Sequence, residues 1–201
     1  MARPKATPEQ RAEVRRSIQR AAADLYREEG LAAISARAVA KKAGVSVGTI
    51  YSYFGDLAGL GQSLWEGRVA RQEQVFRDVA AEHADPVLRL QALLTSYLLF
   101  GVEQHEIYRS VLLFVRPESL GVPDKQDLSD FAFPTLLAQA LRDGQASGQI
   151  VAGEPADLAQ VLWSGVHGAI ALPINLARVD LKSVEEMRDM TVDALMRMVQ
   201  A

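Results

Sequence analysis

The sequence predicts an all-α protein of about nine helices, and three observations support this fold class. Leu, Ala, Arg, Gln and Glu, which are good helix formers, dominate the chain. No stretch alternates apolar and polar residues as a half-buried strand would. Apolar residues recur instead at intervals of three and four, in segments bounded by capping residues and glycines.

Three helices are expected in the first quarter of the chain. The first covers residues 8–29, beginning after a threonine cap and ending at Gly30. The second and third cover residues 35–43 and 46–53, each with a serine cap, and Gly44 provides the tight turn between them.

Six further helices are expected in the remainder. They cover residues 56–83, 86 to beyond 98, 106–115, 128–147, 155–177, and 183 to beyond 198. Pro173 is expected to kink the helix over 155–177. The stretch 117–123, which contains two prolines and a glycine, is expected to be a loop and the most mobile part of this region.

The composition is that of a soluble globular protein. The 201 residues are 49% apolar and 23% charged, enough to bury a core without cross-links. The chain has no cysteine, which excludes disulfides, thiolate metal sites and cysteine nucleophiles. Apolar runs fall far short of the roughly 18 residues of a spanning helix, and no signal-peptide core is visible at the start. We therefore expect a cytoplasmic protein with no membrane partner.

Charge is divided unevenly along the chain. Residues 1–55 carry ten Lys or Arg against five Asp or Glu, whereas residues 56–201 carry 12 basic against 20 acidic groups. A basic first quarter on an acidic remainder is typical of a chain whose first part binds a polyanion. Charge alone leaves open the alternative of a solvated basic helix.

Residues 35–54, with the sequence SARAVAKKAGVSVGTIYSYF, are the most informative segment. Two short helices meet around Gly44, which permits a left-handed turn, and Ala43 permits a close crossing. Apolar side chains hold this crossing against the first helix. The third helix is left with a surface of hydroxyls, a valine and a bare glycine, which suits a DNA major groove. Its positive end, around Ser46, is also an anion site.

This segment resembles the helix-turn-helix of the TetR/AcrR family of bacterial transcription regulators. The matching residues are Ala43-Gly44-Val45-Ser46, Gly48-Thr49-Ile50-Tyr51 and Tyr53-Phe54, preceded by the basic first helix and Gly30. The motif covers about residues 10–64, and the remainder agrees in length and helical character. The resemblance implies a DNA-binding domain over 1–55 and a ligand-binding and dimerisation domain over 56–201.

The resemblance also implies that the third helix reads the major groove of double-stranded DNA. By matching position, the expected contacts are Val47, Gly48, Thr49, Tyr51 and Tyr53, with Ser35, Arg37 and Ser46 near the DNA backbone. Arg3 and Lys5 are expected to form an arm that reaches phosphate or the minor groove. The alternative for the two tyrosines is packing within the domain. The basic residues 11, 15, 16, 41 and 42 are more typical of a solvated face.

One position departs from the family pattern. The family usually has a lysine three residues after the Tyr-Phe pair, and this chain has Leu57 there. A phosphate contact at the start of the fourth helix is therefore in doubt, and we expect DNA affinity to depend less steeply on salt than is usual for the family.

The C-terminal part resembles the ligand-binding and dimerisation part of these regulators. Residues 163–168, WSGVHG, are similar to the Trp…His-Gly signature of one subclass. Small residues of this helix and an apolar stripe of the last helix suggest a homodimer face that forms a four-helix bundle. Its expected residues are Gly165, Ala169, Met187, Thr191, Leu195 and Met198. The alternative is that these residues pack inside one subunit.

A small-molecule pocket is expected among the fourth to eighth helices. Its candidate walls are Phe76, Phe100, Tyr108, Phe114, Trp163 and His167. Their apolar character favours a hydrophobic or aromatic effector. The three histidines are dispersed without carboxylates at ligand spacing, so no metal site, cofactor or catalytic triad is expected.

The leading functional hypothesis is a homodimeric, ligand-responsive repressor that is released from a palindromic operator when effector binds. An all-helical enzyme or carrier is the second hypothesis, but the sequence contains no nucleophile–base pair, phosphate loop or cofactor motif. An activator or an architectural DNA binder of the same fold is the third, and the sequence does not separate it from a repressor.

Overall fold

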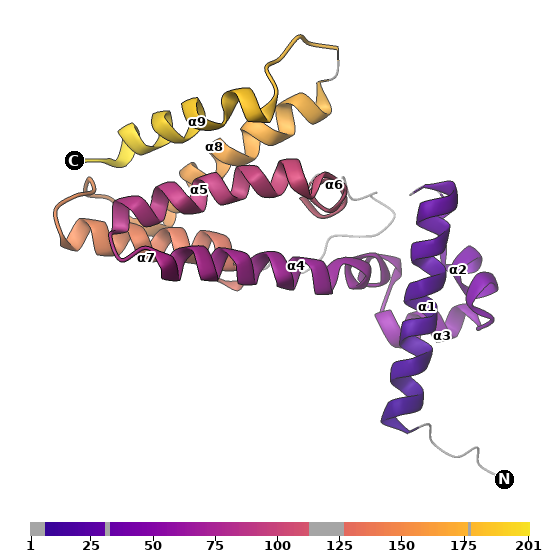
Figure 1. The fold of residues 1–201 in the computed structure, drawn as a ribbon. Helices are drawn as coiled ribbons and strands as arrows, with labels where there is room; N and C mark the ends of the chain where they lie inside the picture. Colours follow the sequence, from indigo (N-terminus) through magenta and orange to yellow (C-terminus); the bar gives the residue numbers. More distant parts are fainter. Residues whose placement is uncertain (1–6, 31–32, 113–126, 177) are drawn as a thin grey trace. The chain divides into compact units, whose positions relative to one another are not determined.

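A computed structural model of the protein describes residues 7–30, 33–112, 127–176 and 178–201 (Figure 1). These residues form nine α-helices and one short 3-10 helix, which confirms the all-α fold class. The helices are α1 (Pro8–Glu29), α2 (Ala36–Ala43), α3 (Val47–Phe54), α4 (Leu57–Glu82), α5 (Pro86–Glu103), α6 (His105–Leu112), η3 (Leu128–Asp130), α7 (Ala132–Ala146), α8 (Pro155–Asn175) and α9 (Val184–Val199). The described residues contain no strand beyond one isolated bridge between Ile150 and Gln200.

The chain divides into two compact units, and the division falls inside α4 between Gly67 and Arg68. The boundary expected from the sequence is at residue 55. The start of α4 belongs with the first unit because Leu60 is fully buried in that unit's core, with Leu57 and Leu64 packed against it.

The first unit is held together by a small apolar core beneath three helices. Ile18 and Ala22 of α1, Val39 of α2 and Ile50 of α3 are completely buried. Serine caps begin α2 and α3, and Gly44 ends α2 with a φ of 68°. That left-handed conformation suits glycine, so this residue sets the sharp turn between the two helices.

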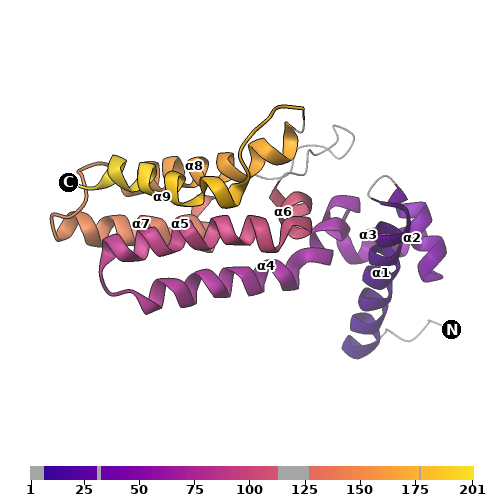
Figure 2. The ribbon, with the colours of Figure 1, turned by 45° about the horizontal axis from the view of Figure 1, so that its top comes forward.

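The second unit is built around α5, which packs against α7, α8 and α9 (Figure 2). Gly101 allows α5 to approach α8 closely, because a Cβ atom there would lie 2.5 Å from Cδ1 of Ile170. Both views show α8 and α9 side by side. None of the described helices is long and apolar enough to cross a membrane.

Observed helix ends agree closely with the expected ones, with two differences. The expected helix over 128–147 is two elements, because η3 is capped by Asp127 and α7 begins only at Ala132, with Pro134 in its first turn where proline is tolerated. The eighth helix ends at Asn175, slightly earlier than expected, with Pro173 inside it as expected. The expected loop over 117–123 lies outside the described residues.

Candidate nucleic-acid interface and effector site

Helix α3 has two clearly different sides. At 100° per residue, Val47, Ile50 and Phe54 fall on one side, and all three lie in or against the core of the first unit. The opposite side is centred on Gly48 and Ser52, both exposed. The core side therefore determines which residues of α3 face solvent.

The solvent side of α3 carries short polar groups and one aromatic ring. Thr49 and Tyr51 flank Gly48 and Ser52, and the side chain of Tyr51 is 48% exposed. A Cβ atom at Gly48 would meet only Ser46 Oγ, at 3.6 Å, so the backbone is open at this point. We call Gly48, Thr49, Tyr51 and Ser52 the outward face of α3. Its hydroxyls and bare backbone can contact phosphates and base edges.

The two predicted serines act as helix caps. Ser46 Oγ accepts a hydrogen bond from the Thr49 backbone N–H at 3.0 Å and lies 2.8 Å from Thr49 Oγ1. Ser35 Oγ accepts one from the Ala38 N–H at 3.1 Å. These bonds satisfy amide groups at the starts of α2 and α3 and fix where each helix begins.

Two predicted contacts, Val47 and Tyr53, lie partly buried against the core rather than on the outward face. Tyr53 is also held by α1, since the guanidinium group of Arg11 lies 5.8 Å from its ring centroid. For Tyr53 this arrangement favours the packing alternative.

Arg15 links α1 to the end of α3, a role that the sequence analysis missed. Its Nη1 donates to the Tyr53 carbonyl oxygen at 3.1 Å, and its guanidinium group lies 4.6 Å from the Phe54 ring centroid. A cation at the C-terminal carbonyls of a helix satisfies an unpaired acceptor and matches the helix dipole. Only a contact between helices distant in sequence could identify it.

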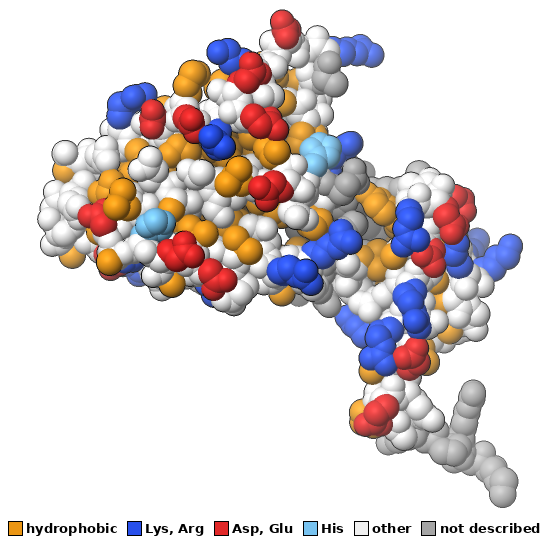
Figure 3. Space-filling model, viewed as in Figure 1, with side chains coloured by type: hydrophobic (Ala, Val, Ile, Leu, Met, Phe, Trp, Pro, Cys, Tyr) orange, Lys and Arg blue, Asp and Glu red, His pale blue; other side chains and the backbone are white. Residues whose placement is uncertain are grey.

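The basic residues of the first unit fall into two groups. Several pair with acids within the unit: Arg16 and Arg20 with Glu13, Arg27 with Asp24, and Lys42 with Glu28. Arg37 and Lys41 are exposed on α2 and pair with no acid among the described residues. Figure 3 shows Lys and Arg side chains gathered over the first unit. Arg3 and Lys5 lie outside the described residues.

Leu57, at the family's lysine position, packs partly buried against the core of the first unit. The leucine therefore has a packing role. The expectation of a shallower salt dependence stays a prediction.

The predicted pocket aromatics form a closely packed core in the second unit. Phe76, Phe100 and Tyr108 are 4%, 7% and 0% exposed, and Tyr97 and Phe133 pack among them. The shortest ring-centroid separation, 4.5 Å, joins Tyr97 to Phe133. The half-buried Trp163 lies beside Phe131, with ring centroids 6.3 Å apart. Phe114 lies outside the described residues.

His167 is hydrogen-bonded to this core. Its Nδ1 lies 2.7 Å from Tyr108 Oη and 3.2 Å from Tyr97 Oη. Burial lowers the pKa of His167, so the ring is neutral at pH 7 and Nδ1 can accept from the hydroxyls. Burial also raises the pKa of Tyr97 to about 12, so its phenol keeps its proton. No three His, Asp or Glu residues in the described part of the chain are placed to hold a metal ion.

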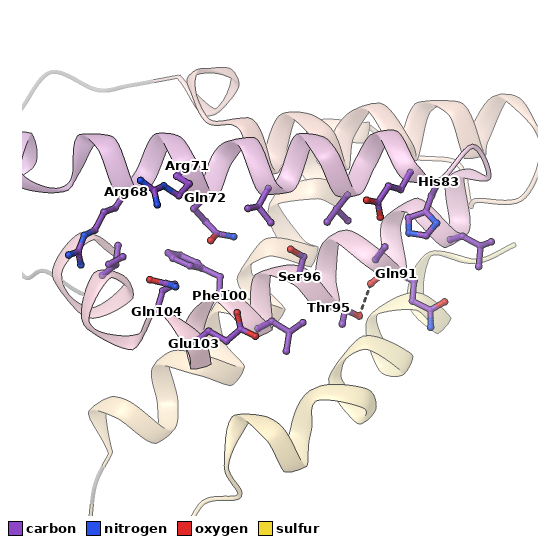
Figure 4. A pocket seen from close by; sticks show the side chains of 17 residues that line it. Arg68, Arg71, Gln72, His83, Gln91, Thr95, Ser96, Phe100, Glu103 and Gln104 are labelled. Carbon is purple, nitrogen blue, oxygen red and sulfur yellow. Dashed lines mark hydrogen bonds between the residues drawn. The ribbon is translucent and has the colours of Figure 1, made fainter.

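A groove of about 1090 Å³ runs between α4 and α5, within the second unit (Figure 4). Among the predicted pocket residues that the structure describes, Phe100 lines it. The other lining residues, which include Arg71, Thr95 and Ser96, were not anticipated. The sequence gives no signal for them, because the groove forms only where two helices diverge.

The predicted dimer residues divide between internal packing and exposure. Gly165 and Leu195 pack against each other inside the chain, since a Cβ at residue 165 would lie 2.7 Å from Leu195 Cδ2. Ala169, Met187 and Thr191 are half-buried, and Met198 is 45% exposed. Nearby apolar side chains of α8 and α9 are also exposed by 48–53%: Val161, Leu172 and Met190.

Comparison with solved structures shows which fold this is. A putative tetR family transcription regulator from Shewanella sp. PV-4 is 16% identical with a TM-score of 0.65, over 94% of this chain and 98% of that one. FadR from Bacillus subtilis in complex with stearoyl-CoA is 19% identical with a TM-score of 0.63, over 90% and 97%. A putative regulator from Saccharomonospora viridis in complex with choline is 21% identical with a TM-score of 0.65, over 94% and 99%.

Comparison of the sequence agrees with this fold. No curated protein matches the chain. Residues 18–61, which include α2, α3 and the packed face of α1, match the family model of the bacterial regulatory proteins, tetR family. Regulators of this kind are DNA-binding proteins and not enzymes. Residues 18–61 therefore carry a helix-turn-helix of the tetR family, and the whole chain has the fold of these regulators, with an N-terminal helix-turn-helix and a helical C-terminal domain.

Proposed function

We propose that the protein is a cytoplasmic homodimeric repressor, that α3 reads a palindromic operator, and that a small, largely apolar effector releases it. One observation carries the DNA-binding part of the proposal. Helix α3 is anchored by fully buried Ile50, and it turns a face of Gly48, Thr49, Tyr51 and Ser52 outward. That face has the size and chemistry of a major-groove reader.

Two exposed apolar stripes support the dimer. Val161 and Leu172 of α8, and Met190 and Met198 of α9, each expose 45–53% of their surface. Val161 and Leu172 share one helical face at a spacing of three turns, as a bundle interface requires. A dimer would present two copies of α3 to two half-sites of a palindrome.

The effector part of the proposal rests on the second unit. Two structurally similar regulators were solved with stearoyl-CoA and with choline, which are chemically unlike each other. The α4–α5 groove offers this chain a volume suited to one small molecule. Binding there would have to favour one spacing of the two reading helices in order to release DNA.

The decisive experiment is selection of bound duplexes from a random DNA pool by the purified full-length protein at physiological salt. An enriched palindrome with half-sites about one helical turn apart would support the proposal. Enrichment of no sequence, with only weak salt-sensitive binding, would overturn it. A reporter gene placed behind the selected operator then separates repression from activation.

The dimer is tested by light scattering at micromolar concentration. Met198→Arg places a charge in the exposed α9 stripe and should yield monomers. Gln139→Arg adds the same charge at an exposed position of α7 and should leave the dimer intact. A wild-type monomer that binds operator with full affinity would contradict the proposed assembly.

A further inference from the structure

The α4–α5 groove is lined by one face of each helix. Its α4 residues, which run from Arg68 to Glu82, are separated by steps of three or four, apart from the adjacent pair Arg71 and Gln72. At 1.5 Å per residue this face is about 21 Å long. The groove is therefore an elongated trough, with its α4 wall in the second unit.

The two ends of the trough differ in charge. Arg68 and Arg71 stand together at one end, where Glu103 lines the opposite wall, whereas Glu82 stands at the other end. Figure 4 shows both arginine side chains extending from the α4 wall, with Gln104 facing them from the other side of the groove. Two neighbouring arginines are a local exception, because residues 56–201 carry eight more acidic than basic groups. The basic end can hold one anionic group.

Arg71 has no role in holding the fold. It is exposed and makes no ion pair or hydrogen bond with any described residue. Arg77 of the same helix provides a contrast, since its Nη2 lies 3.3 Å from Glu73 Oε2 and it does not line the groove.

The middle of the trough is lined mainly by apolar side chains, with the polar Thr95 and Ser96 of α5 among them. Val75 and Val79 line it from α4, and Ala92, Leu99 and Phe100 line it from α5. Val75 remains 41% exposed to water, which is unfavourable for an apolar side chain. A bound apolar hydrocarbon chain would cover it.

The carboxylates of the trough limit the charge of the ligand. Glu103 lines the groove across from the arginines, and Glu82 lines its other end. A ligand with negative charge along its whole length would therefore be repelled. A ligand with a single anionic end and an uncharged chain avoids this repulsion.

We propose that the α4–α5 groove binds a single-chain amphiphile with one anionic end, a long-chain carboxylate or phosphate monoester. The anionic end lies at Arg68 and Arg71, and the chain lies along Val75 and Val79. This inference rests on the proposed function for its regulatory meaning, because the amphiphile would be the effector. Binding itself can be measured without DNA.

The test is calorimetric titration of the full-length protein with dodecanoate below its micelle concentration. Dodecyl phosphate carries the same hydrocarbon chain on a phosphate monoester, so comparing it with dodecanoate shows which anionic group the site prefers. Hexanoate has a shorter hydrocarbon chain and tests whether chain length matters for binding. Dodecyltrimethylammonium has the dodecyl chain with a cationic end. We expect dodecanoate or dodecyl phosphate to bind at one site per chain, and the other two probes to bind at least tenfold more weakly.

Two groove variants and one control locate the site. Arg71→Gln should weaken binding of the anionic probe about tenfold, which is the scale of one charge-assisted hydrogen bond. Val75→Asp should abolish it, and as an exposed residue it can be changed without unfolding the unit. Arg77→Gln removes the same charge outside the groove and should leave affinity unchanged. Circular dichroism confirms that each variant remains helical.

Several outcomes would overturn the inference. Equal binding of the anionic and cationic probes, or equal affinity of Arg71→Gln and wild type, would show that no anion site exists. Self-association that Val75→Asp abolishes, without amphiphile binding, would identify a second copy as the occupant.

The closing measurement separates this inference from the proposed function. Release of the selected operator by dodecanoate, lost in Arg71→Gln, would support both. Groove binding without release would leave the amphiphile site standing and contradict only its role as effector. Failure to select any operator would count against the repressor and not against the groove.

Discussion

The two compact units differ in how far apart in the sequence the residues of their sites lie. In the first unit, the α3 residues that face DNA in our proposal all lie on one helix of eight residues, within about one turn of each other. In the second unit, the aromatic core collects Phe76 from α4, Tyr97 from α5, Tyr108 from α6 and Phe133 from α7. A site on one short helix can be recognised in the sequence, whereas a site between helices cannot.

The units also differ in how they use glycine. In the first unit, Gly44 adopts the left-handed φ of 68° that turns the chain from α2 into α3. In the second unit, glycines set the close approach of helices, as at Gly101 and Gly165. The α4 helix crosses from one unit to the other, and two glycines in the part that belongs to the first unit, Gly59 and Gly67, have different surroundings.

The largest expected effect concerns those α4 glycines. A Cβ atom at Gly59 would lie 2.2 Å from the Phe54 carbonyl oxygen, so Gly59→Ala should destabilise the first unit by about 3 kcal/mol. Gly67, at the division, has nothing within 4 Å of that position, and Gly67→Ala should stabilise the helix by about 1 kcal/mol.

Hydrogen exchange read by mass spectrometry measures both glycine variants. Faster exchange in α1–α3 is expected only for Gly59→Ala, and slower exchange in α4 only for Gly67→Ala. Equal effects of the two substitutions would show that the first unit does not depend on this close approach.

The next effect compares two tyrosines of α3. Tyr51→Ala should lower affinity for the selected operator about tenfold or more with unchanged stability, because the side chain is exposed on the outward face. Tyr53→Ala should lower the thermal midpoint, because its ring packs against the core. Filter binding and thermal unfolding of both variants check this, and reversed behaviour would move the reading face to the Tyr53 side.

Two arginines of the first unit are expected to differ in salt dependence. Arg37→Gln should reduce the slope of log K against log salt by about one, because Arg37 is exposed without an acidic partner and is expected, from its position in the motif, to lie near the DNA backbone. Arg15→Gln should lower affinity with an unchanged slope, because Arg15 holds the Tyr53 carbonyl. Operator titrations of both variants at several salt concentrations measure these slopes. A change of slope for Arg15→Gln would show that Arg15 contacts a phosphate.

The smallest effect concerns pH and the second unit. Burial lowers the pKa of His167 in the folded state, so below its ordinary pKa of 6.5 the unfolded chain takes up a proton that the folded chain does not. The free energy of unfolding should therefore fall as the pH drops from about 6.5 toward the folded-state pKa. Urea titrations across this range should show the fall in wild type and a smaller one in His167→Gln.

The sequence predicted more of the first unit than of the second. The α1–α3 boundaries and the serine caps follow from local signals that act over three or four residues. It also placed Phe76, Phe100, Tyr108 and His167 in one neighbourhood, where the structure has them. It could not tell a packed aromatic core from an open pocket, because that depends on whether side chains from four helices fill the space between them.

The sequence by itself determined the helical fold class, the order of the helices and the resemblance of residues 35–54 to a TetR/AcrR helix-turn-helix, because periodicity, caps and this motif are local properties of the chain. Only the tertiary structure decided that Val47 and Tyr53 turn toward the core, that Arg15 holds the end of α3, that Gly165 packs on Leu195, and that the open groove lies between α4 and α5. Each of these depends on contacts between residues far apart in the chain, and no local spacing encodes how closely two helices approach.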